Sequence, residues 1–302
     1  MKSKPFVSVI IPVYNDAHRL QQCLQALYVQ TYPSSRYEVV VVDNGSTEDI
    51  ATVARSFPNV VMTQEAKRGS FQARNQGLTV ARGDIVAFTD TDCVPSAEWL
   101  TAGVQLLSDT AIAAGRIAFT FKGSKPSAAE LLDSQFYLQQ ETYVRQEQYG
   151  ATANLFVWRE VFTTIGGFNT QLPNLGDKEW CQRAYQAGFS IRYCATAIVE
   201  HPARQLSALL AKARRQTRAN YILYSLRYGK PTPKKMVQSV LNQCHPATFW
   251  NALKDGSLSR RERLRYLWVV LCFRWAIACQ LISLLLRPTA ADGAARAIIR
   301  AA

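Results

Sequence analysis

Short apolar runs rich in β-branched residues alternate, along the first ninety residues, with longer segments whose apolar residues recur at helical spacing. The four runs are VSVIIPVY (7–14), YEVVVVD (37–43), NVVMTQ (59–64) and DIVAFTD (84–90). In the first intervening segment Leu20, Leu24 and Leu27 fall on one face of a helix, which can therefore cover a sheet. This alternation predicts an α/β fold with a doubly wound parallel sheet in the N-terminal half.

Polar residues stand at the ends of three of these runs. They are Tyr14-Asn15 at the end of the first run, Asp43-Asn44-Gly45 at the end of the second and Asp90-Thr91-Asp92 at the end of the fourth. In doubly wound sheets, ligands bind beyond the carboxyl ends of the strands. We therefore expect the three strand ends to meet in one ligand-binding crevice.

Beyond residue 110 the pattern becomes mixed. It predicts a strand over 112–121, a helical stretch near 128–147, a polar turn at 176–179 and two short strands, IRYC (191–194) and AIVEH (197–201). The composition turns strongly basic near Ala203, which is the best candidate for a domain boundary. The predicted organisation is one domain over 1–202 and a second region over 203–302.

The fourth run ends in two aspartates. Side chains alternate along a strand, so Asp90 and Asp92 are expected to point the same way, and their oxygens suit Mg²⁺ or Mn²⁺. A divalent cation at a strand end suggests that the ligand is a diphosphate. The alternative is that the two carboxylates cap the next helix or face water.

Other polar positions fit a nucleotide at the same edge of the sheet. Asp43 can accept a hydrogen bond from a pyrimidine N–H, or it can cap the following helix, a role for which Ser46 competes. Arg74 and the basic loop Lys67-Arg68-Gly69 bring positive charge to the strand ends. For the basic loop, simple solvation is the alternative.

Six segments of the chain, taken in order, resemble the family-2 glycosyltransferases of GT-A fold. The resemblance spans about residues 6–201. The matching segments are VSVIIPVYND, VVVVDNGSTED, KRGSFQARNQGL, ARGDIVAFTDTDC, ATANLFVWREVFTTIGGFN and GDKEWCQRAYQAGFSIRYCATAIVEH. Each motif is weak alone, but their shared order is specific. The resemblance implies a GT-A type mixed sheet with a Rossmann-like nucleotide-binding half.

The resemblance also implies a donor and a metal. The donor is a nucleotide-diphosphate sugar, with a UDP-sugar as the default over GDP or TDP, and the cofactor is Mn²⁺ or Mg²⁺. Metal binding is expected at Asp90, Asp92 and His201, although His201 could instead be an ordinary structural histidine. Asn154 falls where the family lines the donor-sugar pocket, or it is simply a turn residue. The expected nucleotide-sugar contacts are Pro12, Tyr14, Asn15, Asp43, Arg74 and Asp90.

For the reaction, the resemblance implies inverting transfer to an acceptor hydroxyl, with Asp177 as the catalytic base. The family commonly has an acidic residue where this chain has Gly176, which leaves Glu179 as the alternative base. Asp177 could also cap the helix that follows it. Processive members carry a Gln-x-x-Arg-Trp signature, whereas the segment 213–221 offers Gln216 and arginines but no tryptophan. We therefore expect transfer of a single sugar per encounter.

The basic charge is concentrated at the end of the chain. Residues 201–302 hold 18 of the 35 Lys and Arg residues but only 3 of the 22 Asp and Glu residues, so the net charge of +13 arises there. Within this region 206–228 has the pattern of a basic amphipathic helix. The near-neutral charge of the rest of the chain excludes a general nucleic-acid role, and we expect the basic region to meet a membrane surface.

An apolar run over 266–286 supports this interpretation. It is long enough to span a bilayer, although Arg274 lies near its middle. The arginines at 260, 261, 263 and 265 favour anionic headgroups and keep that flank cytoplasmic. The run either spans or lies in the interface, and we prefer a monotopic arrangement. A buried helix of a helical dimer is the structural alternative.

The sequence therefore predicts a glycosyltransferase on the cytoplasmic face of the cell membrane. Its expected acceptor is lipid-linked or a glycolipid, as in the assembly of a cell-surface polysaccharide. A nucleotidyltransferase that makes sugar nucleotides is the second candidate, but the Gly-rich phosphate loop that it needs after the first strand is replaced by Pro-Val-Tyr-Asn. A nonenzymatic basic membrane adaptor is the third, and it would leave the acidic strand ends without a role.

Overall fold

The computed structural model describes residues 4–243 and 259–286, and its contacts divide the chain into two compact units. Unit 1 comprises residues 1–120, 138–170 and 176–202, and unit 2 comprises 121–137, 171–175 and 203–302. The second unit thus includes two segments that precede the predicted boundary at Ala203.

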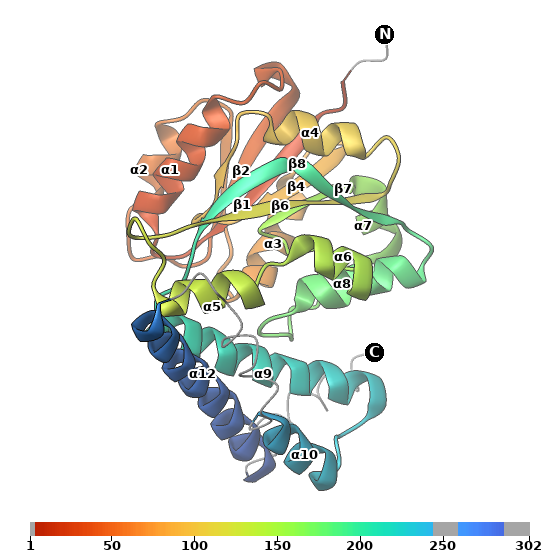
Figure 1. Ribbon diagram of the computed structural model, residues 1–302. Coiled ribbons are helices and arrows are strands. Elements are labelled where there is room, and N and C mark those ends of the chain that lie inside the picture. The colour runs from red at the N-terminus through yellow and green to blue at the C-terminus, as the bar shows by residue number, and fades with distance from the viewer. Residues whose placement is uncertain (1–3, 244–258, 287–302) are drawn as a thin grey trace. The chain divides into compact units, whose positions relative to one another are not determined.

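Unit 1 is built on an eight-stranded sheet with the order β3-β2-β1-β4-β7-β6-β8-β5 (Figure 1). Strand β1 pairs in parallel with β2 and β4, whereas β7 runs antiparallel to its neighbours β4 and β6. The expected doubly wound mixed sheet is confirmed. The strands are β1 (Val7–Val13), β2 (Tyr37–Asp43), β3 (Val60–Gln64), β4 (Ile85–Thr89), β5 (Val94–Pro95), β6 (Ile112–Thr120), β7 (Asn154–Trp158) and β8 (Ile191–Pro202).

Helices cover both faces of this sheet, which is why its central strands are apolar on both sides. On β1, Ile11 packs in a cluster with Leu24 and Trp99, whereas its neighbour Ile10 packs in the opposite cluster with Trp180. Leu24 and Trp99 belong to α1 and α4, and Trp180 belongs to α8. The helices and the 3-10 helix of unit 1 are α1 (Ala17–Tyr28), η1 (Ser34–Arg36), α2 (Ile50–Arg55), α3 (Ser70–Val80), α4 (Trp99–Leu106), α6 (Gln140–Glu147), α7 (Arg159–Ile165) and α8 (Gly176–Gln186).

Two expectations about the middle of the chain are corrected. The short strands expected at 191–194 and 197–201 form the single strand β8. Its pairing with β6 shifts, so that Gly115 pairs with Cys194 but Arg116 pairs with Ile198, and residues 195–197 are left as an irregularity. The helical stretch expected over 128–147 is two helices, because the chain turns at Leu138, whose φ of 56° lies in the left-handed region.

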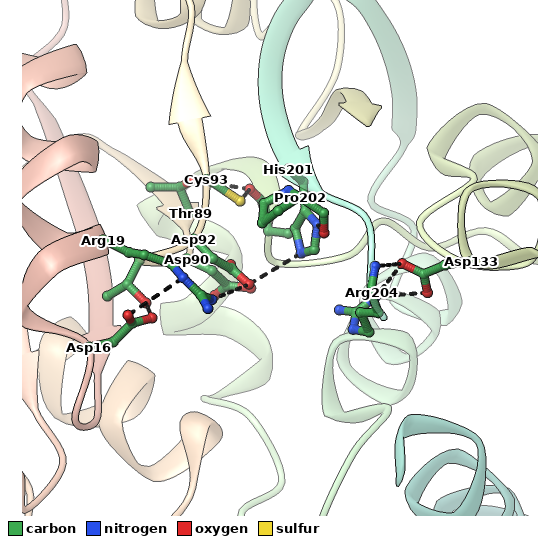
Figure 2. A network of polar contacts seen from close by, with 12 residues as sticks. Asp16, Arg19, Thr89, Asp90, Asp92, Cys93, Asp133, His201, Pro202 and Arg204 are labelled. Carbon is green, nitrogen blue, oxygen red and sulfur yellow. Dashed lines mark hydrogen bonds and ion pairs between the residues drawn. The ribbon is translucent and has the colours of Figure 1, made fainter. Parts of the chain in front are cut away.

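Unit 2 is helical. It consists of α5 (Ala128–Phe136), α9 (Leu206–Tyr228), α10 (Pro233–Gln243) and α12 (Arg260–Leu286). Helix α12 packs against α5, α9 and α10 (Figure 1). Ile222, Met236 and Leu284 contribute to a core that α9, α10 and α12 share. Asp133 of α5 is fully buried and accepts hydrogen bonds from the backbone N–H of Arg204 at 2.9 Å and from its Nη1 at 3.2 Å (Figure 2).

Helix α12 is long and apolar enough to cross a membrane, with a mean hydropathy of 2.1 in its most apolar window. Only 33% of that window is buried within the protein. One face, which includes Val270 and Phe273, packs inside unit 2. The opposite apolar residues recur three, four or seven positions apart and are exposed, so they form one line along the helix. We call this line the α12 stripe; it consists of Leu264, Trp268, Leu271, Trp275, Ile282 and Leu286.

Candidate active site at the strand ends

The polar strand ends lie at a topological switch point of the sheet in unit 1. From β1 the chain proceeds to β2 and β3 on one side, and then returns to β4 on the other side. Pairing of β1 with β4 ends at Ile10 and Phe88, whereas pairing of β1 with β2 continues to Val13 and Asp43. The strands β1 and β4 therefore separate before Pro12, which is the place where doubly wound sheets bind ligands.

Hydrogen bonds tie the loop after β1 to the loop after β2. The Asn15 backbone N–H donates to Ser46 Oγ at 3.0 Å, and Asn15 Oδ1 accepts from the Thr47 N–H at 2.7 Å. Asp43 Oδ1 accepts from the Ser46 N–H at 2.9 Å. Asp43 Oδ1 therefore caps the turn that follows β2, the alternative role considered for this residue. Its Oδ2 accepts no hydrogen bond from the described residues.

The basic loop is fixed against the end of β2. The side chain of Asn44 is buried, donates to the carbonyls of Glu65 and Lys67, and accepts from the Gly69 N–H at 2.7 Å. The Arg68 guanidinium lies over the Tyr14 ring, 3.4 Å from its centroid. Simple solvation does not describe this loop. From the sequence, Asn44 is expected only to be part of the turn after β2, because an asparagine in a turn is too common to be a signal of more.

Arg74 is 3% exposed and forms a short ion pair with Asp90 Oδ1 through Nη2. Its Nη1 donates to the Ser70 carbonyl, and its buried Nε has no hydrogen-bond partner among the described residues. The structure therefore brings these two predicted donor-site residues together, with one oxygen of Asp90 committed to the arginine.

Asp92 and His201 face each other at the same place (Figure 2). Asp92 Oδ2 lies 3.5 Å from His201 Nε2, and the His201 ring is 3% exposed. His201 Nδ1 lies 2.8 Å from the Pro202 carbonyl oxygen. Because a carbonyl can only accept, Nδ1 carries a proton, and in the neutral imidazole Nε2 is then the nitrogen that can bind a metal ion. Two such acceptors, each able to bind Mn²⁺ or Mg²⁺ at about 2.1 Å, fit a shared divalent cation.

The predicted set of three metal ligands is only partly assembled. In the part of the chain that the structure describes, no group of three or more His, Cys, Asp or Glu residues is arranged to hold one metal ion. Asp92 and His201 converge, whereas Asp90 is turned to Arg74. Divalent cations at phosphate sites are commonly completed by substrate oxygens and water, so a two-ligand protein site is chemically adequate.

Two residues of α1 and its N-cap reach the aspartates and were missed by the sequence analysis. Arg19 Nη1 lies 3.8 Å from Asp92 Oδ2, and Arg19 Nε lies 3.7 Å from Asp16 Oδ1 (Figure 2). Thr91 Oγ1 donates to Asp16 Oδ2 at 3.0 Å. Asp16 directly follows Tyr14-Asn15 and Arg19 lies three residues later, but charged residues at a helix start are too frequent to indicate a site.

The cysteines beside the aspartates are not nucleophiles. Burial, followed by the negative charges of Asp90 and Asp92, raises the pKa of the Cys23 thiol. The pKa of the Cys93 thiol is also raised, first by burial and then by the same two charges. Both thiols therefore stay protonated, which excludes thiolate chemistry at this site.

Asp177 lies in the first turn of α8, half-buried. Its Oδ1 accepts from the Lys178 N–H at 2.9 Å, and its Oδ2 accepts from the Thr152 N–H at 3.4 Å. The next residue, Ala153, accepts through its carbonyl from Thr89 Oγ1 at 3.1 Å. Since Thr89 is the last residue of β4, one loop links Asp177 to the loop that carries Asp90 and Asp92.

Glu179 is engaged differently. It forms an ion pair with Arg183 at 3.1 Å, and Arg183 also donates to the Gly167 carbonyl. At Gly176 an added Cβ would lie 2.7 Å from the Phe71 ring, so an acidic side chain does not fit there. The departure from the family pattern at Gly176 is thus explained by packing.

Asn154 is a fully buried structural residue. Its Oδ1 accepts from Trp99 Nε1 at 2.8 Å, and its Nδ2 donates to the carbonyls of Arg116 and Ala197, both at 2.9 Å. The side-chain amide of Asn154 thus joins β6, β7 and β8. Because its oxygen and its nitrogen are already hydrogen-bonded inside the protein, this amide does not contact a donor sugar.

The sequence has recognisable relatives. The family profile described as Glycosyl transferase family 2 matches residues 8–168, more than half of the chain. Glycosyltransferase AglE of Haloferax volcanii is 40% identical over 215 residues, which are 69% of this chain and 70% of AglE. The pre-mycofactocin glycosyltransferase of Mycobacterium tuberculosis is 30% identical over 208 residues, which are 66% of this chain and 43% of that protein.

The fold has solved counterparts. The mannosyltransferase PcManGT from Pyrobaculum calidifontis, solved with GDP-Man and Mn²⁺, has a TM-score of 0.65 at 22% identity and covers 93% of this chain and 88% of its own. S. aureus TarS 1–349, solved with UDP-GlcNAc, has a TM-score of 0.54 at 17% identity and covers 95% and 88%. At these identities the similarity concerns the fold.

Proposed function

Because the chain belongs to glycosyl transferase family 2 and has a GT-A type fold, we propose that unit 1 transfers a single sugar from a nucleotide-diphosphate sugar to an acceptor hydroxyl, with inversion. The observation that carries this proposal is the Asp92–His201 pair, 3.5 Å apart, in which Asp92 lies in the loop after β4 and His201 lies on β8. Such a pair suits the diphosphate of an activated sugar donor.

The nucleoside would lie against the loops after β1 and β2. The Asp43 Oδ2, without a partner among the described residues, can accept from a base N–H, and the Tyr14–Arg68 stack offers a flat surface beside it. Pro12 and Asn15 shape the same edge, and Asn15 holds the turn through Thr47. A UDP-sugar is our default donor. Support for the donor class comes from PcManGT and TarS, whose structures contain GDP-Man and UDP-GlcNAc.

Asp92 and His201 would hold the divalent cation, with Asp90 and Arg74 completing the charged wall beside it. Bound there, Mn²⁺ or Mg²⁺ would neutralise the negative charge that a leaving diphosphate accumulates. Arg74 holds Asp90 in place from a buried position on α3, and its Nε–H can donate to a phosphate oxygen. PcManGT, with the same fold, was solved with Mn²⁺.

Asp177 is the proposed catalytic base. As the acceptor oxygen bonds to the anomeric carbon, its proton passes to the Asp177 carboxylate, and the bond from that carbon to the diphosphate breaks with its electron pair leaving on the nucleoside diphosphate. Attack from the face opposite the leaving group inverts the anomeric configuration. Glu179 is less suited because Arg183 already holds its carboxylate.

The proposed acceptor is lipid-linked or a glycolipid at the cytoplasmic face of the cell membrane, as in the assembly of a cell-surface polysaccharide. The α12 stripe and the exposed arginines Arg260, Arg261 and Arg265 support this location. One face of α12 packs on protein and the other is bare, which favours a helix lying in the interface. Transfer of one sugar per encounter is supported by the segment 213–221, which lacks the tryptophan of the signature in processive enzymes. Gln216 of this segment accepts a hydrogen bond from Asn174 Nδ2 at 2.8 Å.

The test is release of nucleoside diphosphate. Full-length protein in detergent is incubated with UDP-, GDP- and TDP-sugars and Mn²⁺, beside Asp92→Asn and the exposed control Asp109→Asn. We expect release from one donor that needs the metal, falls about a thousandfold in Asp92→Asn and is kept in the control. Equal rates in wild type and Asp92→Asn would contradict the proposal.

The same assay separates the two competing functions. A nucleotidyltransferase would form a nucleoside triphosphate when pyrophosphate and a nucleotide sugar are supplied. A membrane adaptor would show no metal-dependent release from any donor, and Asp92→Asn would be silent. Membership in a glycosyltransferase family supports neither outcome.

A further inference from the structure

A cavity of about 700 Å³ lies within unit 2, among α5, α9, α10 and α12. Its size falls within the range of about 300–1,000 Å³ that is usual for small-molecule sites. Most of its wall is apolar and comes from four separate elements. The main apolar contributors are Phe136, Tyr221, Met236, Phe273, Ile277 and Leu281.

Two cations line this cavity without an acid, the half-buried Arg274 and the exposed Lys235. Arg274 of α12 and Lys235 of α10 both line the cavity, and no Asp or Glu is among its lining residues in the described part of the chain. Arg274 Nη1 donates to Gln243 Oε1 at 3.0 Å, and its guanidinium carbon lies 5.5 Å from the centroid of the Phe136 ring. These contacts orient the guanidinium, but they do not neutralise its charge.

For the half-buried Arg274, a cation in an apolar wall is costly unless an anion accompanies it, whereas the exposed Lys235 adds charge at the rim. Lys235 Nζ donates to the Tyr224 hydroxyl at 2.7 Å, which holds the second charge at the same cavity. Cations from two different helices at one site suit a ligand group with more than one negative charge, and phosphate is the usual such group. The two cations of the cavity therefore suit a phosphate, and its apolar walls suit a hydrocarbon chain.

Helix α12 lines the cavity with one side and exposes an apolar stripe on the other. Phe273, Arg274, Ile277 and Leu281 line the cavity, and the stripe residues of the same helix are exposed. Two tryptophans of the stripe, Trp268 and Trp275, are of the type enriched where protein meets the headgroup region. A bilayer that covers the stripe would place lipids beside the helix that builds one wall of the cavity.

We propose that this cavity binds the phosphate end and the first chain segment of a long-chain lipid phosphate, with Arg274 and Lys235 holding the phosphate. The proposal rests on the proposed function in one respect, since the bound lipid is inferred to be the carrier of the acceptor. A free phosphate would gain nothing from the aromatic and aliphatic walls, and a neutral lipid would leave the two cations unmatched.

The probe is radiolabelled farnesyl monophosphate, a short lipid phosphate. The full-length protein is placed in nanodiscs of neutral phosphatidylcholine, and binding is measured by equilibrium dialysis against empty nanodiscs. We expect saturable binding that unlabelled farnesyl phosphate displaces, whereas farnesol and inorganic phosphate at the same concentration do not. Equal displacement by farnesol would reduce the site to a hydrophobic slot, and displacement by inorganic phosphate would make it a free-phosphate site; either result overturns the proposal.

Variants locate the binding in this cavity. Arg274→Gln is expected to weaken affinity about ten- to a hundredfold through loss of a charge-assisted contact. Lys235→Gln should weaken it about tenfold, and Ile277→Trp should abolish it by filling the space. The matched control is Lys234→Gln, because Lys234 is exposed on the same helix as Lys235 and does not line the cavity. Unchanged affinity in Arg274→Gln and Lys235→Gln would refute the site.

Two controls separate this proposal from folding and from the reaction. Lys235 is exposed, so Lys235→Gln tests the charge without disturbing a buried position if Arg274→Gln fails to fold. The dialysis needs no turnover, and Asp92→Asn should bind farnesyl phosphate as the wild type does. Lost binding with intact diphosphate release would overturn the lipid site alone, whereas lost release with intact binding would overturn the transferase alone.

Discussion

Unit 1 and unit 2 use apolar residues in opposite ways. In unit 1 the strand residues alternate between two clusters, and side chains such as Ile10 and Ile11 are fully buried by helices on both faces. In unit 2 the helix α12 buries one side and leaves large side chains such as Trp275, 70% exposed, on the other. Such a stripe is consistent with the proposed membrane contact, because isolated soluble domains rarely leave such a line uncovered.

The charges differ in the same way. At the strand ends of unit 1, Arg74 and Arg19 lie beside Asp90 and Asp92, so the site holds both signs. In unit 2, Arg204 is matched by the buried Asp133, whereas the Arg274 guanidinium meets an amide and a ring. The difference is consistent with the two proposals above, a polar donor held by paired charges in unit 1 and a lipid phosphate in unit 2.

The largest effect is expected from replacing, one at a time, the two candidate catalytic bases of unit 1. Asp177→Asn is expected to lower the rate of sugar transfer about 10²–10⁴-fold, because a general base is lost. Glu179→Gln should stay within about tenfold, since its carboxylate serves the pair with Arg183. Transfer is followed with the donor found in the Asp92 experiment and membrane lipid extract as acceptor. The reverse pattern would move the base to Glu179.

A second test asks whether unit 2 depends on its own buried pair. Asp133→Ala leaves Arg204 without its carboxylate and is expected to cost about 3–5 kcal/mol in the free energy of unfolding. Urea unfolding of wild type, Asp133→Ala and the exposed control Asp109→Ala measures the change. A loss below about 1 kcal/mol would show that Arg204 finds water or another acceptor.

A smaller effect, on membrane binding, is expected from changes in the α12 stripe. Replacing Trp268 or Trp275 by Ser should weaken binding to anionic vesicles about tenfold each, because apolar area no longer enters the interface. Co-sedimentation with phosphatidylglycerol vesicles measures this, and Tyr28→Ser, an exposed aromatic of unit 1, is the control. If both tryptophan variants sediment like wild type while a dimer dissociates, the stripe is a contact between two copies.

The smallest effect concerns the pH dependence of unit 1. Burial alone would raise the pKa of Glu38, but hydrogen bonds from Ser8 and Arg82 outweigh it and hold the pKa below its ordinary value of 4.5. A depressed folded-state pKa contributes stability above pH 4.5 that is lost as the pH falls through the folded-state value. Glu38→Gln should therefore be less stable at pH 7, with a flatter loss of stability between pH 5 and about pH 3. Denaturant unfolding across that range checks it, and parallel curves for the two proteins would contradict it.

Much of the fold of unit 1 could be predicted because its signals are local. The run at 37–43 became β2, because a buried strand is recognised by its continuous apolar sequence, and the run at 112–121 became β6 to within one residue. The break at Leu138 could not be predicted, because the helical pattern continues through it and only tertiary contacts separate α5 from α6.

The candidate site was predicted in part. Asp43, Asp90 and Asp92 stood out because they follow apolar strands directly. The roles of Asn154 and Gly176 could not be predicted, since the amide of one joins three strands and the other makes room for Phe71, which is distant in sequence. Whether Asp177 is the base stays a prediction for the experiment above.

By itself, the sequence determined the family, the doubly wound sheet and the basic, apolar character of the last third of the chain, because motif order, hydrophobic period and composition are properties of the chain alone. Only the tertiary structure decided that Asp90 pairs with Arg74 while Asp92 meets His201. It alone decided that Arg274 lines a cavity while Trp275 is exposed. The physical reason is that neighbours in a helix or loop point in different directions, and what each one meets depends on segments that are remote along the chain.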